Sequence, residues 1–96
     1  MANDTKLRHA YIRVIGRVQG VYYRASAVQA AQTFGVNGWV RNESDGSVAI
    51  HGEGSHEQLE QLIGWCWQGP AGARVDQVNV EWLNHIQGFR GFTIRR

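Results

Sequence analysis

The sequence predicts an α+β fold in which two helices cover one face of an antiparallel sheet. Several segments alternate between apolar and polar residues, as half-buried strands do, and two others repeat apolar residues at the three- and four-residue spacing of a helix. Their order is βαββαβ, with a further short strand at the end. Strands with one apolar face each need a helical layer on that face only, which favours a two-layer sandwich.

The first strand is expected over Leu7–Ile15, because apolar Ala10, Ile12 and Val14 alternate there with polar or aromatic residues. A connection containing two glycines follows. Ala25–Phe34 then has the apolar spacing of a helix, and Gly35 supplies the usual C-terminal stop.

A hairpin is expected next. Val36–Asn42 and Gly46–Gly52 have the length and composition of short strands, and the polar residues Glu43-Ser44-Asp45 lie between them.

The second helix has the clearest local signal, because Ser55 and Gln58 form a capping box and Gly69-Pro70 ends the pattern. Val75–Leu83 alternates again, with Trp82 expected in the core, and Gly91–Arg96 is expected to form the last strand. This order of elements is that of the ferredoxin-like split βαβ fold.

The 96 residues are expected to form one domain over 1–96, with a loose start at 1–6. The single cysteine, Cys66, lies on the apolar stripe of the second helix and is interpreted as a structural thiol. No segment resembles a signal peptide or a membrane span, so a cytoplasmic protein that does not contact membranes is expected.

The net charge of +2 is mild and the ten basic residues are scattered, which favours a small anionic ligand over nucleic acid. The four histidines, His9, His51, His56 and His85, lack metal-ligand spacing, so no metal site is expected.

The run Gly16–Arg24 is the main candidate for a binding site. Its glycines allow several backbone N–H groups to turn inward, and the first turn of the following helix adds unpaired N–H groups and a positive dipole end. Arg24 can grip two phosphate oxygens at once. Taken alone, the run would equally suit a tight connection with a solvated Arg24, and it matches no nucleotide-binding motif.

The same run, Gly-Arg-Val-Gln-Gly-Val-Tyr-Tyr-Arg, resembles the first signature of the acylphosphatase family. Gly38-Trp39-Val40-Arg41-Asn42, followed by glycines and a valine at the expected spacings, is similar to the family's second signature. With the order of elements, the resemblance extends from about Leu7 to Ile94.

The resemblance implies a small, cytosolic enzyme without metal or other cofactor, which hydrolyses acyl phosphates to a carboxylate and inorganic phosphate. A monomer is expected. The resemblance places the phosphate-binding arginine at Arg24 and the water-positioning asparagine at Asn42. The loop that cradles the phosphate falls on Arg17, Val18, Gln19, Gly20 and Val21. Glu43 and the bulky Tyr22-Tyr23 pair depart from many relatives and bear on which substrates enter.

Two alternatives use the same fold. An RNA-recognition module would stack bases on Tyr11 and Trp39 with Arg13 and Arg41 beside them, but its third strand needs aromatic residues that Gly46–Gly52 lacks. An acyl-phosphate-binding accessory domain of a larger protein is disfavoured by the chain's length.

Overall fold

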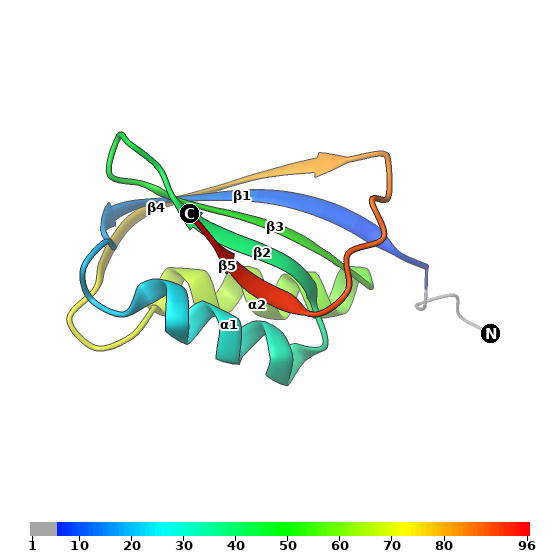
Figure 1. The fold of residues 1–96 in the computed structure, drawn as a ribbon, viewed down its shortest axis with the longest axis horizontal. Coiled ribbons are helices and arrows are strands. Elements are labelled where there is room, and N and C mark those ends of the chain that lie inside the picture. Colours follow the sequence, from blue (N-terminus) through cyan, green and yellow to red (C-terminus); the bar gives the residue numbers. More distant parts are fainter. Residues whose placement is uncertain (1–5) are drawn as a thin grey trace.

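The computed structural model describes residues 6–96, which form a five-stranded sheet with two helices on one face (Figure 1). The elements are β1 (Arg8–Arg17), α1 (Tyr23–Phe34), β2 (Asn37–Asn42), β3 (Val48–Gly54), α2 (His56–Gln68), β4 (Arg74–Leu83) and β5 (Phe92–Arg95). The ferredoxin-like two-layer sandwich is confirmed. Apart from Lys6, the loose start expected at residues 1–6 lies outside the described residues.

Within residues 6–96, neither helix combines the length and the apolar character that a membrane-spanning helix requires.

The strands lie in the order β4-β1-β3-β2-β5. The first four pair antiparallel, whereas β5 lies parallel to β2, so the sheet is mixed rather than antiparallel throughout. The cause is the path of the chain after β4. β4 and β5 are the opposite edges of the sheet, and the segment 84–91 crosses the end of the sheet between them (Figure 1). β5 therefore starts at the same end as β2 and runs in the same direction.

A buried carboxylate holds this crossing segment in place. Glu53, on β3, is only 3% exposed. Its oxygens accept hydrogen bonds from three consecutive backbone N–H groups of the segment, those of Gln87, Gly88 and Phe89, the last two at 3.0 Å. Beside it, Nδ1 of the buried His9 donates to the carbonyl oxygen of His85 at 3.1 Å. These contacts fix the segment that leads the chain to β5 at the sheet edge.

Replacing Glu53 with alanine should destabilise the protein by about 3 kcal/mol, because three backbone N–H groups lose a charged acceptor. Glu53→Gln keeps one acceptor oxygen and should lose less. Urea unfolding measures both, with the exposed Glu81→Ala as the control. A Glu53→Ala free energy of unfolding within experimental error of the parent's would show that the segment is held by other contacts.

The core lies between the sheet and the helices, and one polar contact ties the two helices together within it. The Tyr23 hydroxyl, in the first turn of α1, donates to the carbonyl oxygen of Cys66 on α2 at 2.8 Å. Burial raises the pKa of the Cys66 thiol to about 12, so the thiol stays protonated at neutral pH. The interpretation of Cys66 as a structural residue is confirmed.

Candidate active site

The connection from β1 to α1 depends on two glycines with different constraints. The pairing of β1 with β4 is irregular between Ile15 and Gly16. Gly16 has φ 143°, and a Cβ there would lie 2.2 Å from the carbonyl oxygen of Arg74. Gly20 has open space around it but adopts a left-handed φ of 78°. Any other residue at Gly16 would push β4 away, and most would strain the turn at Gly20.

The loop leaves a row of backbone donors unused. Among residues 6–96, the N–H groups of residues 18–21 donate no hydrogen bond. α1 follows directly, with Tyr22 at its N-cap, no side-chain cap and no acidic residue in its first turn. Its first N–H groups therefore also lack partners. Loop and helix start together provide several free donors in a region of positive potential.

Arg24 is the second residue of α1 and is half-buried. A cation in the first turn of a helix opposes the helix dipole. No carboxylate in the described part of the chain lies within 4.0 Å of its guanidinium, whereas Arg13, Arg41 and Arg74 all pair with acidic side chains. Arg24 therefore has its full charge available for an anion.

Asn42 is the last residue of β2 and pairs with Val48. It lies two residues after the fully buried Val40, and since side chains alternate along a strand, it faces the helical layer. Its amide oxygen is buried and has no hydrogen-bond partner among the described residues. A buried polar atom left without a partner is costly, so an acceptor here is poised for a donor that enters from outside.

A side chain of the loop fixes the distance between the loop and β2. Nε2 of Gln19 donates to the carbonyl oxygens of Glu43 and Ser47, at 2.8 and 2.9 Å. Glu43 directly follows Asn42 in the chain. Gln19 is therefore a positioning residue: it holds the loop and the end of β2 in one arrangement.

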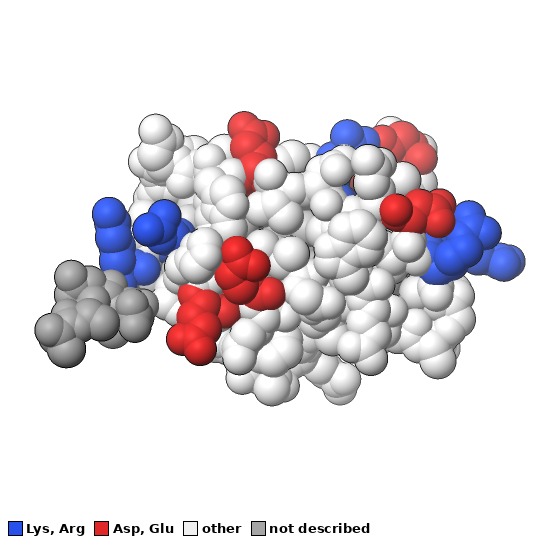
Figure 2. All heavy atoms as spheres, turned by 180° about the vertical axis from the view of Figure 1, so that it is seen from behind, with Lys and Arg blue, Asp and Glu red and all other residues white. Residues whose placement is uncertain are grey.

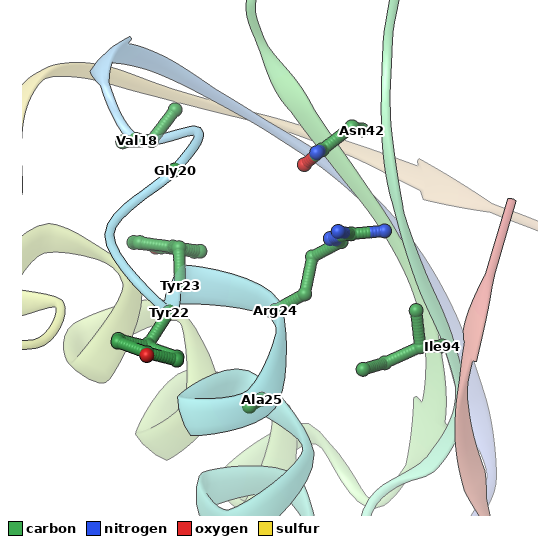
Figure 3. A pocket seen from close by; sticks show the side chains of 8 residues that line it. All are labelled: Val18, Gly20, Tyr22, Tyr23, Arg24, Ala25, Asn42 and Ile94. Carbon is green, nitrogen blue, oxygen red and sulfur yellow. The ribbon is translucent and has the colours of Figure 1, made fainter.

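These groups surround one pocket of about 340 Å³ (Figure 3). Its lining residues are Val18, Gly20, Tyr22, Tyr23, Arg24, Ala25, Asn42 and Ile94. Figure 3 shows the side chains of Arg24, from α1, and Asn42, from β2, directed toward the same space. The pocket thus offers a free guanidinium, free backbone donors and a free acceptor, which suits an anion and a water molecule.

The residues that the sequence singled out divide into two groups. Arg24, Asn42, Val18 and Gly20 line the pocket. Arg17, Gln19 and Val21 do not: Arg17 ends β1, Gln19 bridges to the hairpin, and Val21 packs against the core.

The pocket also contains residues that sequence reasoning did not assign to it. Tyr22, Tyr23 and Ala25 line it because they lie beside Arg24 in the chain. Ile94 lies on β5, far away in sequence, and reaches the pocket because β5 pairs with β2. Nothing in the local pattern around Ile94 distinguishes it from an ordinary strand residue.

The face of the molecule opposite to the view of Figure 1 carries no continuous basic strip (Figure 2). On the face shown in Figure 2, basic and acidic side chains are interspersed, with wide uncharged areas between them. A short anion suits this distribution better than a long polyanion.

Comparisons with known proteins agree with one another. A family model described as Acylphosphatase matches residues 10–94. The acylphosphatase of Pelotomaculum thermopropionicum is 47% identical over 85 residues, which cover 88% of this chain and 92% of the relative. That of Anaeromyxobacter sp. (strain Fw109-5) is 49% identical, with 94% and 97% covered. The crystal structure of acylphosphatase from Bacillus subtilis superposes with a TM-score of 0.91 at 31% identity, covering 95% of this chain and all of that one.

Proposed function

Because the chain belongs to the acylphosphatase family and is a hydrolase of acyl phosphates, we propose that this pocket is its active site, with Arg24 binding the phosphoryl group and Asn42 orienting the attacking water. The observation that carries the proposal is that two side chains without a partner, Arg24 and Asn42, line the same pocket. A half-buried cation without a carboxylate partner lies near a buried acceptor without a donor.

The phosphoryl group binds at the start of α1. Two of its oxygens accept hydrogen bonds from the forked N–H groups of Arg24, and others accept hydrogen bonds from the backbone N–H groups of loop residues 18–21. Bound phosphate also removes the conflict between Arg24 and the helix dipole. Positioning and neutralisation of phosphoryl charge supply most of the catalysis in phosphoryl transfer.

The water molecule lies on the Asn42 side of the phosphorus. The amide of Asn42 has no useful basicity, but its oxygen can accept a hydrogen bond from water and thereby aim a lone pair at phosphorus. The water oxygen forms the new P–O bond while the bond from phosphorus to the acyl oxygen breaks. The proton of the water passes to a phosphate oxygen, and the acyl group leaves as a carboxylate.

This leaving group explains why the pocket needs no general acid. A carboxylate is stable at neutral pH without protonation, so departure demands little help. The side chains that line the pocket include no carboxylic acid, histidine or lysine, which is consistent with such a reaction.

The alternatives from the sequence are not favoured. On β3 the residues of the open sheet face include Ala49 and His51 rather than the aromatic pair that an RNA-recognition module uses. The relatives above are named as enzymes and are matched over nearly their whole length, which argues against an accessory role. We also infer a cytoplasmic enzyme, because a single buried thiol fits a reducing compartment. We expect it to act as a monomer, since the lining of the pocket comes from one chain.

Phosphate release from acetyl phosphate tests the proposed function. We expect turnover that excess chelator leaves unchanged, competitive inhibition by inorganic phosphate, and little hydrolysis of a phosphate monoester such as p-nitrophenyl phosphate, whose leaving group is much more basic. Loss of activity on adding chelator, or a preference for the monoester, would contradict this chemistry.

A further inference from the structure

Tyr22 has a backbone conformation that its residue type disfavours. With φ 63° and ψ 23° it is in the left-handed region, and among residues 6–96 it is the only non-glycine residue with positive φ. Nine described glycines adopt such angles elsewhere. At the N-cap of α1, a serine, aspartate or asparagine could also have accepted a helix N–H, which Tyr22 does not. Both features mark a position where stability favours another residue.

The side chain of Tyr22 makes no contact with the other described residues that would offset the cost of its backbone conformation. It is 84% exposed, and in the described part of the chain its hydroxyl makes no hydrogen bond and its ring stacks on no other aromatic ring. Strained backbone conformations cluster at active sites and ligand contacts, which makes Tyr22 a candidate for contact with a ligand.

Its place in the pocket indicates which part of the ligand it contacts. Figure 3 shows Asn42 and Tyr22 on opposite sides of Arg24, and Ile94, 41% exposed, also lies on the side away from Asn42. In an in-line displacement the leaving group departs opposite the attacking water. If water is held by Asn42, the acyl group leaves on the side away from Asn42, where the accessible ring of Tyr22 lines the pocket.

We propose that Tyr22 is a specificity-determining residue that packs against the acyl group, so that its ring contributes to the hydrolysis of acyl phosphates with an aromatic acyl group and not to that of acetyl phosphate. This inference rests on the proposed function, since it takes the orientation of the substrate from the roles of Arg24 and Asn42. An acetyl group is too small to cover the Tyr22 ring, whereas a benzoyl group can stack on it.

The test compares kcat/KM for benzoyl phosphate and acetyl phosphate in several variants. Because the same two substrates are used throughout, their intrinsic reactivities cancel when the ratio in a variant is divided by the ratio in the parent. Tyr22→Asn should lower the benzoyl-to-acetyl ratio about 3- to 10-fold, the range typical of one aromatic contact. Tyr22→Phe keeps the ring and should keep the ratio. Trp67→Ala, which removes a 52% exposed aromatic residue outside this pocket, is the matched control and should leave the ratio unchanged.

Urea unfolding of the same variants separates this role from a structural one. Asparagine tolerates the left-handed conformation better than tyrosine does, so Tyr22→Asn should unfold at a urea concentration equal to or above the parent's. A ratio that stays unchanged in Tyr22→Asn, whether or not both activities fall together, would overturn the assignment of Tyr22 while leaving the enzyme an acylphosphatase. A parent protein that hydrolyses neither substrate would instead overturn the proposed function.

Discussion

Arg24→Ala should lower kcat/KM for acetyl phosphate by at least about 100- to 1000-fold, the usual cost of losing one preorganised donor to developing charge. The loss should be at least this large because Arg24 supports both phosphate binding and the transition state. The affinity for inorganic phosphate, measured as an inhibition constant, should fall as well. Arg24→Lys keeps the charge but loses the planar fork and should recover only part of the activity.

The stability of Arg24→Ala should change in the opposite direction. Removing an unpaired cation from the first turn of α1 relieves its repulsion by the helix dipole, which is worth about 0.3 to 1 kcal/mol. An inactive protein that is at least as stable as the parent would locate the defect in the site. Arg8→Ala, at the far end of β1, is the control and should retain activity. Unimpaired hydrolysis by Arg24→Ala would exclude Arg24 as the phosphate ligand.

Asn42→Ala should lower kcat by about 100- to 1000-fold while the inhibition constant for phosphate changes little. The amide oxygen of Asn42 has no hydrogen-bond partner among residues 6–96, so its removal leaves none of their groups unsatisfied and should cost little stability. The effect is expected in turnover because the group orients the water rather than the phosphate. Steady-state kinetics measures the change in kcat, and inhibition by phosphate measures the change in phosphate affinity.

Two further variants sharpen the assignment of Asn42. Asn42→Asp retains an acceptor for water but places a negative charge beside the phosphate, so it should weaken phosphate binding in addition to turnover. Asn79→Ala removes an exposed asparagine from the edge strand β4 and should have no effect. Weaker phosphate binding with unchanged turnover in Asn42→Ala would reverse its role from orienting water to binding phosphate.

Most of the fold could be predicted from the sequence because its signals are local. The capping box of Ser55 and Gln58 is formed as expected, with the Gln58 N–H donating to Ser55 Oγ at 3.1 Å. The hairpin is also present, but β3 starts at Val48, two residues later than predicted. The reason is that Asp45 accepts hydrogen bonds from the backbone N–H and hydroxyl of Ser47, which extends the turn.

The errors concern features that depend on position within the whole sheet. Trp82 alternates like a core residue, but it is 41% exposed, because β4 is an edge strand. Its ring stacks instead on His56 at the start of α2, with ring centroids 5.1 Å apart. The parallel pairing of β5 was missed for the same reason, since it follows from a crossing segment held by Glu53, and no local pattern encodes that contact.

The site residues that lie in one continuous segment could be predicted from the sequence. Those that the fold brings together from distant segments were harder to predict. The loop and Arg24 follow from a single run of residues, and Asn42 joined them through the second signature. Their convergence in one pocket is a property of the fold. Tyr22 was noted for its bulk, but its left-handed backbone and its exposure become evident only in three dimensions.

Hydrolysis of acetyl phosphate in ¹⁸O-labelled water tests the proposed mechanism most directly, because it reports which atom the water attacks. The parent enzyme should place the label in inorganic phosphate and leave acetate unlabelled, at an enzyme concentration that makes the uncatalysed reaction negligible. Label in the acetate would mean that water attacks the carbonyl carbon, and the roles proposed for Arg24 and Asn42 would be wrong.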